Sequence, residues 1–128
     1  MARQRHGPEY KIQAAFIAFL KDRGWHVERM VGNAFQMGIP DIYAAHPKYG
    51  QRWIDLKNPG RYELTKAQRK KWPIWERFGV GIWIIVAADE EEYDKLFRPP
   101  NWRRYWKAKY DEEIEELKEA MDDLYRET

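Results

Sequence analysis

Residues 38–57 have the sequence GIPDIYAAHPKYGQRWIDLK, which places two strand-forming runs on either side of one turn. The first strand is expected over Asp41 to Ala45, directly after Pro40, because proline at the first position of a strand interrupts no ladder hydrogen bond. The turn is expected over residues 46–50 and the second strand over Gln51 to Lys57. The stretch therefore predicts an antiparallel β-hairpin with a somewhat long connection.

Side chains of the second predicted strand alternate between its two faces. One face carries Ile54 and Leu56, and the other carries Trp53, Asp55 and Lys57. The carboxylate of Asp55 and the ammonium of Lys57 therefore point to the same side of the strand. For an isolated Asp-x-Lys, the competing interpretation is an ordinary pair on the solvent-exposed face of a half-buried strand.

Asp41 lies on the partner strand of this hairpin, where pairing can bring it alongside Asp55. Two carboxylates a few ångströms apart form a hard-oxygen site suited to Mg²⁺ or Mn²⁺. Lys57 beside such a site can help to deprotonate a water molecule and neutralise charge that develops on phosphate.

Upstream of the hairpin, a helix is expected with Pro8 in its first turn and Gly24 as its stop. Glu9 would lie in the first turn, where a carboxylate interacts favourably with the helix dipole. A strand follows over Trp25 to Val31, and a loop over Gly32 to Gly38.

Downstream, Thr65 is a favourable N-cap for a helix that runs to about Phe78. Pro73 is expected to kink or split this helix near Trp72, because it lacks the N–H for the helical hydrogen bond. Val80 to Ala87 has the continuous apolar pattern of a strand that is buried on both faces and lies centrally in a sheet.

Asp89 to Phe97 is expected as a short acidic helix that Pro99 and Pro100 terminate, and the chain is helical by pattern from Asn101 onward. The last segment carries a narrow apolar stripe that favours core packing, with partner-helix or dimer contact as the alternative; its members are Ile114, Leu117, Met121 and Leu124. The order of elements predicts an α/β fold with a mixed sheet flanked by helices, in which residues 1–100 form the core and residues 101–128 a helical extension.

The composition narrows the possible chemistry. The 128 residues include no cysteine and no serine, so thiolate metal sites, disulfides and serine or cysteine nucleophiles are excluded. The three histidines show no zinc-ligand spacing, and no phosphate-binding glycine motif occurs. The longest apolar run, Val80 to Ala88, is far shorter than the ~20 residues that span a bilayer, so we expect a soluble cytoplasmic protein of a bacterium or a virus host, without a membrane partner.

Charge is divided unevenly along the chain. The net charge is +2, but residues 1–110 carry +9 and residues 111–128 carry −7. A basic body is what a polyanionic partner such as nucleic acid requires, and the alternative is charge that only maintains solubility.

Together, Gly38-Ile39-Pro40-Asp41, Asp55-Leu56-Lys57, the Asn58-Pro59-Gly60 turn and Thr65 with Gln68 resemble the PD-(D/E)xK nuclease superfamily. The pattern from Gly38 to about Ala88 is most similar to its virus-type replication-repair (VRR-NUC) branch. The resemblance implies a restriction-endonuclease-like core and a Mg²⁺- or Mn²⁺-dependent DNA endonuclease.

By the family's pattern, Asp41, Asp55 and the backbone carbonyl of Leu56 would bind the metal, Lys57 would assist the attacking water, and Gln68 would support the active-site face. A first-helix glutamate, matched here by Glu9, completes the metal site in related enzymes. Glutamate is the commoner acid in the family at the position of Asp55, but the family uses either aspartate or glutamate there. The single-domain relatives imply a homodimer that acts on branched DNA, such as a four-way junction or a flap.

Basic residues next to the expected site would contact DNA phosphates or form a solvated helix face; they are Arg61, Lys66, Arg69, Lys70 and Lys71. A second segment is both basic and aromatic; it contains Arg103, Arg104 and Lys107 together with Trp102, Tyr105 and Trp106. Core packing is the favoured interpretation for its aromatic residues. Two other functions remain open: a non-catalytic nucleic-acid-binding module on the same fold, and an interaction protein that acts through its acidic C-terminal helix.

Overall fold

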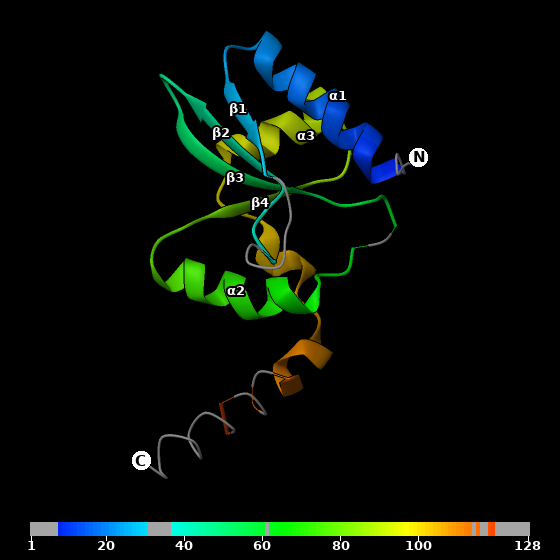
Figure 1. The fold of residues 1–128 in the computed structure, drawn as a ribbon, viewed down its shortest axis with the longest axis vertical. Coiled ribbons are helices and arrows are strands. Elements are labelled where there is room, and N and C mark those ends of the chain that lie inside the picture. Colours follow the sequence, from blue (N-terminus) through cyan, green and yellow to red (C-terminus); the bar gives the residue numbers. More distant parts are fainter. Residues whose placement is uncertain (1–7, 31–36, 61, 114, 116–117, 120–128) are drawn as a thin grey trace.

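The computed structural model describes residues 8–30, 37–60, 62–113, 115 and 118–119. This part of the chain forms an α/β fold with a four-stranded mixed sheet between helices (Figure 1). In chain order the elements are α1 (Pro8–Asp22), β1 (His26–Arg29), β2 (Ile42–His46), β3 (Gly50–Leu56), α2 (Lys66–Arg77), β4 (Ile82–Ile85), α3 (Glu90–Asp94) and the 3₁₀ turns η1 (Lys95–Phe97) and η2 (Trp102–Tyr105). The predicted order of elements is confirmed.

The sheet has the strand order β1-β2-β3-β4. β2 and β3 form the predicted antiparallel hairpin, with Ile42 opposite Ile54. β1 also pairs with β2 in an antiparallel orientation. β3 and β4 are parallel, and α2 supplies the long crossover that a parallel pair requires. β1 is shorter than expected, and residues 31–36 of the predicted strand end and loop lie outside the described residues.

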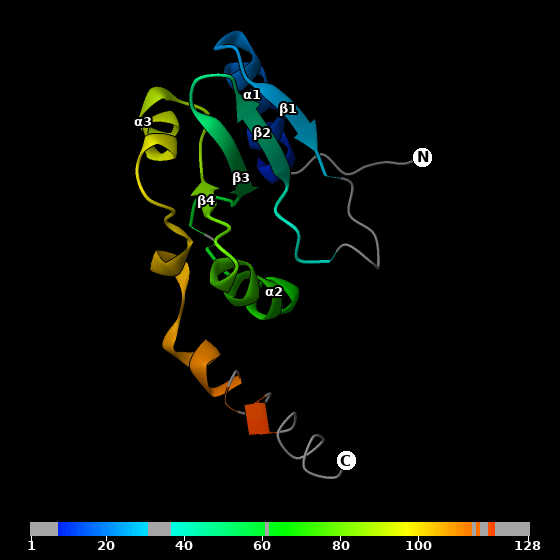
Figure 2. The ribbon, with the colours of Figure 1, turned by 90° about the vertical axis from the view of Figure 1, so that its left-hand side faces the viewer.

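Helices cover both faces of the sheet, α1 and α3 on one side and α2 on the other (Figures 1 and 2). On the α1 side, Ile54 and Leu56 of β3 are buried against Phe16 and Leu20 of α1. On the α2 side, the buried residues are Leu64, Trp72, Ile82, Ile84, Trp102 and Tyr110, with Trp53 packed against them. The faces predicted for β3 are confirmed, but α2 covers the face that carries Asp55, so this face is not solvent-exposed.

Helix α2 is continuous through Pro73, so the expected split at this residue is wrong. Contacts on both sides of the proline hold the helix together. Trp72 is fully buried and packs edge-on against Trp102, with ring centroids 5.9 Å apart. Trp75 packs in the same way against Trp53 of β3, at 5.1 Å. These contacts maintain one helix although one helical hydrogen bond is missing.

The prediction that β4 is central is also wrong, because among the described strands β4 lies at an edge of the sheet. Its four residues are buried because helices cover both faces and the chain after α3 covers the open edge. There, Asn101 replaces a neighbouring strand: its Oδ1 accepts from the Ile84 N–H at 2.6 Å, and its Nδ2 donates to the Ile84 carbonyl at 3.0 Å. The side chain thus satisfies the main chain at an edge that would otherwise be open to pairing.

The C-terminal extension is not one continuous helix, because residues 106–107 separate η2 from a helix that begins at residue 108. Trp102 and Tyr110 are each 1% exposed and belong to the core, which confirms the packing interpretation for Trp102. The apolar stripe predicted near the C-terminus falls on residues outside the described part of the chain. No helix in the described part has both the length and the apolar character needed to cross a membrane.

Replacing Asn101 with alanine is expected to lower the free energy of unfolding by about 2–4 kcal/mol, because two buried main-chain groups of Ile84 lose their partner. Urea denaturation measures the loss, and amide hydrogen exchange at Ile84 should accelerate. Gln51→Ala, on the exposed start of β3, is the control and should change stability by less than about 0.5 kcal/mol. Equal stability of the two variants would contradict the assigned role of Asn101.

Candidate active site

The hairpin register brings Asp41 and Asp55 together. Ile42 pairs with Ile54, so one step further along the antiparallel ladder Asp41 stands opposite Asp55. Residues directly opposite each other share a face, with Cβ atoms about 4.5–5.5 Å apart. Asp41 is fixed there because its Oδ2 accepts a hydrogen bond from the Leu56 N–H at 2.9 Å. The two carboxylates therefore lie side by side at the end of β3.

The same hydrogen bond shows which way the Leu56 carbonyl points. In an extended strand, the N–H and C=O of one residue face the same neighbour. The Leu56 N–H faces Asp41, whereas the next N–H, that of Lys57, donates to Ile85 of β4 at 3.0 Å. The Leu56 carbonyl therefore lies on the side of β3 where Asp41 is found.

Asp55, Lys57 and Gln68 form a closed triangle of buried polar groups. Lys57 Nζ lies 3.1 Å from Asp55 Oδ2 and donates to Gln68 Oε1 at 2.8 Å. Gln68 Nε2 donates to the same Asp55 Oδ2 at 3.2 Å. The side chains of Asp55 and Lys57 are only 2% and 8% exposed, so each charge depends on these partners.

Gln68 reaches the triangle because the start of α2 is capped by a reciprocal pair of hydrogen bonds. Thr65 is the N-cap, and its hydroxyl accepts from the Gln68 N–H at 3.1 Å. The Gln68 Oε1 accepts in turn from the Thr65 N–H at 2.9 Å, which completes a capping box. One side chain thus both begins the helix and holds Lys57 and Asp55.

Asp55 retains an unused acceptor. Its Oδ1 is buried and has no hydrogen-bond partner among the described residues. Burial raises the pKa of the Asp55 carboxyl above its usual range, although Lys57 and Asp41 act in the opposite direction. A buried carboxylate oxygen beside a second carboxylate is suited to a divalent cation, which would replace the lost solvation.

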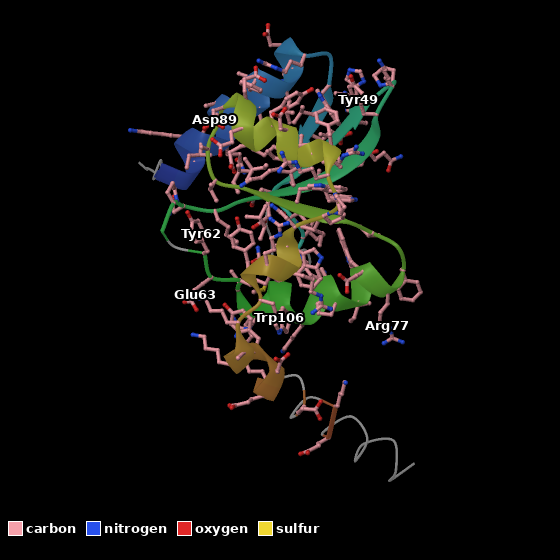
Figure 3. All side chains as sticks on the ribbon, turned by 180° about the vertical axis from the view of Figure 1, so that it is seen from behind. Tyr49, Tyr62, Glu63, Arg77, Asp89 and Trp106 are labelled. Atoms are coloured by element: carbon pink, nitrogen blue, oxygen red, sulfur yellow. The ribbon has the colours of Figure 1, made fainter. Side chains whose placement is uncertain are left out.

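An open cleft of about 780 Å³ lies in front of this group, and Asp41, Lys57 and Gln68 contribute to its wall. Tyr62 and Glu63, on the segment that leads from β3 to α2, form part of its rim (Figure 3). Glu63 pairs with two cations of the C-terminal segment, Lys109 at 3.1 Å and Lys107 at 3.4 Å, and these lower its pKa. Sequence reasoning did not assign either lysine to the site, because only the tertiary fold brings residues 107–109 to the cleft.

Those predicted DNA-contacting residues that the structure describes have different surroundings. Arg69 makes two hydrogen bonds to Glu113, at 2.8 and 2.9 Å, and one to the Leu64 carbonyl, so it joins α2 to the C-terminal helix. Lys70 and Lys71 line a different, shallow surface with Met37 and Ile74. Lys66 is exposed in the first turn of α2, and Arg61 lies outside the described residues.

The side chain of Glu9, the expected further metal ligand, also lies outside the described part of the chain, although its residue belongs to α1. Among the described side chains, no three of the His, Asp and Glu residues gather closely enough to hold a metal ion. A metal at this site would therefore rely on two described carboxylates and on the main chain.

Gly38 and Trp72 help to position Asp41; the sequence predicted Gly38 only as part of the motif and gave Trp72 no role at the site. Gly38 has a φ of +87°, and a Cβ there would lie 2.8 Å from the carbonyl oxygen of Ala67 in α2, so only glycine fits. The Gly38 carbonyl accepts from Trp72 Nε1 at 2.6 Å. The segment before Asp41 is thereby held against α2. In the sequence, the only sign of this close contact is the glycine three residues before Asp41.

Comparison of the chain with known protein families, curated proteins and solved structures finds no match in any of the three. A function must therefore be argued from the geometry of the site and from the motif resemblance.

Replacing Gln68 with alanine is expected to cost more stability than replacing Thr65. Thr65→Ala removes one cap hydrogen bond and should cost about 1 kcal/mol. Gln68→Ala removes the other half of the capping box and takes one buried hydrogen bond from each of Lys57 and Asp55, which keep only their ion pair, so it should cost about 1–3 kcal/mol more. Urea denaturation of both variants tests this order, and a smaller loss for Gln68→Ala would contradict the bridging role.

Proposed function

We propose that this protein is a metal-dependent DNA endonuclease that hydrolyses phosphodiester bonds and has a restriction-endonuclease-like core of the PD-(D/E)xK type. The observation that carries the proposal is the buried Oδ1 of Asp55, which lacks a hydrogen-bond partner among the described residues and lies beside Asp41. The ordered motif that contains Asp41, Asp55, Lys57 and Gln68 supports the same reaction class.

The residues present fit a hard divalent cation, Mg²⁺ or Mn²⁺. Asp41, Asp55 and the Leu56 carbonyl would hold it, because they supply oxygen ligands on one side of β3. When bound, the ion would polarise a phosphate oxygen and lower the pKa of a bound water. Glu9, carried by α1, is proposed as a further ligand on the strength of the resemblance.

Lys57 supplies positive charge at the wall of the cleft. Gln68 and Asp55 fix its ammonium group, so little reorganisation is needed when negative charge develops on the phosphate. The ammonium can also orient the attacking water. Gln68 does not need to touch substrate; its role is to hold Lys57 and Asp55 in place.

The test is incubation of the protein with labelled four-way junction, flap, duplex and single-stranded DNA in Mg²⁺, Mn²⁺ or EDTA. Wild-type protein should cut DNA only with metal, and Asp55→Asn and Lys57→Ala should each reduce the rate at least about 100-fold because each removes charge stabilisation at the site. Asp94→Asn and Lys21→Ala, which make the same chemical changes at exposed positions, are the matched controls and should cut at the wild-type rate.

Circular dichroism must show that all four variants fold. Metal-independent cutting, or cutting by Asp55→Asn at the wild-type rate, would refute the proposed site. Binding of DNA without cutting under every condition would favour the non-catalytic binding module, and no DNA binding at moderate salt would favour an interaction protein.

The resemblance also supports branched DNA as the preferred substrate and a homodimer as the active form. Light scattering should then give twice the 15.6 kDa mass of the chain. A monomer at high concentration would remove the dimer from the proposal, and the substrate series identifies the preferred DNA structure.

A further inference from the structure

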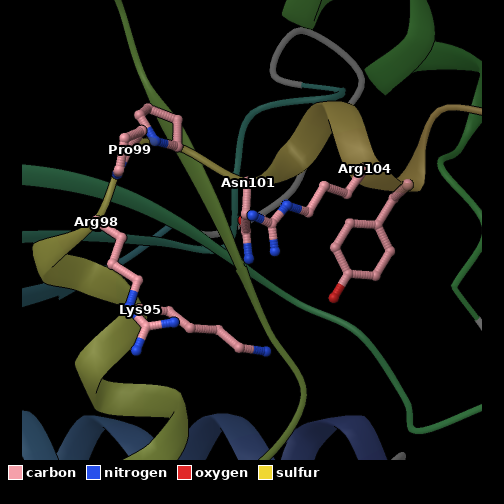
Figure 4. A pocket seen from close by; sticks show the side chains of 7 residues that line it. Lys95, Arg98, Pro99, Asn101 and Arg104 are labelled. Carbon is pink, nitrogen blue, oxygen red and sulfur yellow. The ribbon is translucent and has the colours of Figure 1, made fainter.

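A second, smaller pocket of about 270 Å³ lies on the outer side of β4, between η1 and η2. Lys95 and Arg98 project from one side of it and Arg104 from the other (Figure 4). Tyr105 completes the group that we call the cationic pocket: Lys95, Arg98, Arg104 and Tyr105. None of the residues that line the pocket is acidic.

The charge of the cationic pocket is only partly compensated. Lys95 pairs with Glu92 at 2.6 Å. Arg98 and Arg104 have no ion-pair partner in the described part of the chain, and both are exposed. Two guanidinium groups around one small depression favour a phosphate, because the planar donors of arginine match its oxygens in pairs.

The backbone that carries these arginines is anchored. The Arg98 carbonyl accepts from Trp83 Nε1 at 2.9 Å, and Asn101 is bonded twice to Ile84. Pro99 and Pro100, which lie between Arg98 and Asn101, further restrict the main chain. Anion binding at a site whose main chain is already fixed costs less conformational entropy.

The cationic pocket adjoins the candidate active-site cleft. The ring of Tyr105, in the pocket, contacts the ring of Tyr62, in the cleft, edge-on with centroids 5.5 Å apart. A nucleic-acid strand that leaves the cleft across the rings of Tyr62 and Tyr105 would next meet Arg98 and Arg104. Aromatic rings bordered by cations are the usual surface for nucleic-acid strands, because bases stack on the rings and phosphates bind the cations.

We propose that the cationic pocket binds a backbone phosphate of the nucleic-acid substrate, on the far side of the Tyr62–Tyr105 pair from the bond that is cut. This inference rests on the proposed nuclease function. The cationic pocket is then a substrate-binding site outside the reacting centre. Removing its arginines should therefore weaken DNA binding and leave the chemical step intact.

The test is the salt dependence of DNA binding, measured by fluorescence anisotropy with fluorescein-labelled single-stranded DNA in EDTA. The double variant Arg98→Gln/Arg104→Gln should bind more weakly, and the slope of log K against log salt should fall in magnitude by about 0.7 for each lost phosphate contact. Arg98→Lys/Arg104→Lys keeps both charges and should retain most of the slope.

Lys21→Gln/Arg77→Gln is the matched control, because it removes two exposed positive charges at the ends of α1 and α2. Arg77 lies at the opposite end of α2 from Tyr62 and Glu63 (Figure 3). This control should keep the wild-type slope, and an equal fall in both double variants would mean a diffuse charge effect and would overturn the proposal.

Cleavage kinetics separate this inference from the proposed function. With metal present, Arg98→Gln/Arg104→Gln should raise KM and leave kcat unchanged. If Arg98→Gln/Arg104→Gln still cuts DNA with an unchanged KM and an unchanged salt slope, the phosphate-binding role of the cationic pocket is overturned, but the proposed nuclease function is not. A wild-type protein that never cuts, but whose slope still depends on the two arginines, would overturn the nuclease while the pocket remains a nucleic-acid contact.

Discussion

The ion pair between Asp55 and Lys57 is the interaction on which the rest of the structure depends. Both charges are removed from water, and a buried charge without a partner costs several kcal/mol. Gln68 supplies the remaining hydrogen bonds, so α2 must lie where its first turn reaches β3. The crossover between β3 and β4 is therefore tied to the candidate site, and a displacement of α2 would take two hydrogen bonds from the buried ion pair.

The same helix also positions the opposite carboxylate. Gly38 passes so close to Ala67 that no side chain fits between them, and Trp72 holds its carbonyl. Asp41 lies three residues after Gly38, and its carboxylate accepts a hydrogen bond from the peptide N–H of Leu56. The two sides of the candidate metal site thus rest on one helix, which explains why a polar site can be placed with precision at the edge of a hydrophobic core.

The C-terminal segment completes both the core and the surface around the site. Trp102 and Tyr110 fill the α2 side of the sheet, and Asn101 closes the edge of β4. Lys107 and Lys109 then reach the rim of the cleft through Glu63. Residues beyond 100 are therefore part of the structure that forms the candidate site, and they give it positive charge in a chain whose last residues are acidic.

The sequence by itself determined the order of the elements, the hairpin and the face on which Asp55 and Lys57 lie, because these follow from local turn chemistry and from the two-residue repeat of a strand. Tertiary structure decided the rest. β4 is apolar whether it is central or at an edge, and only the Asn101 contacts show that it is an edge. Pro73 breaks a helix in isolation, but burial of Trp72 and packing of Trp75 against Trp53 maintain α2. The burial of the ion pair and the position of Lys107 and Lys109 at the rim of the cleft likewise arise from packing between segments far apart in the chain, which no local pattern encodes.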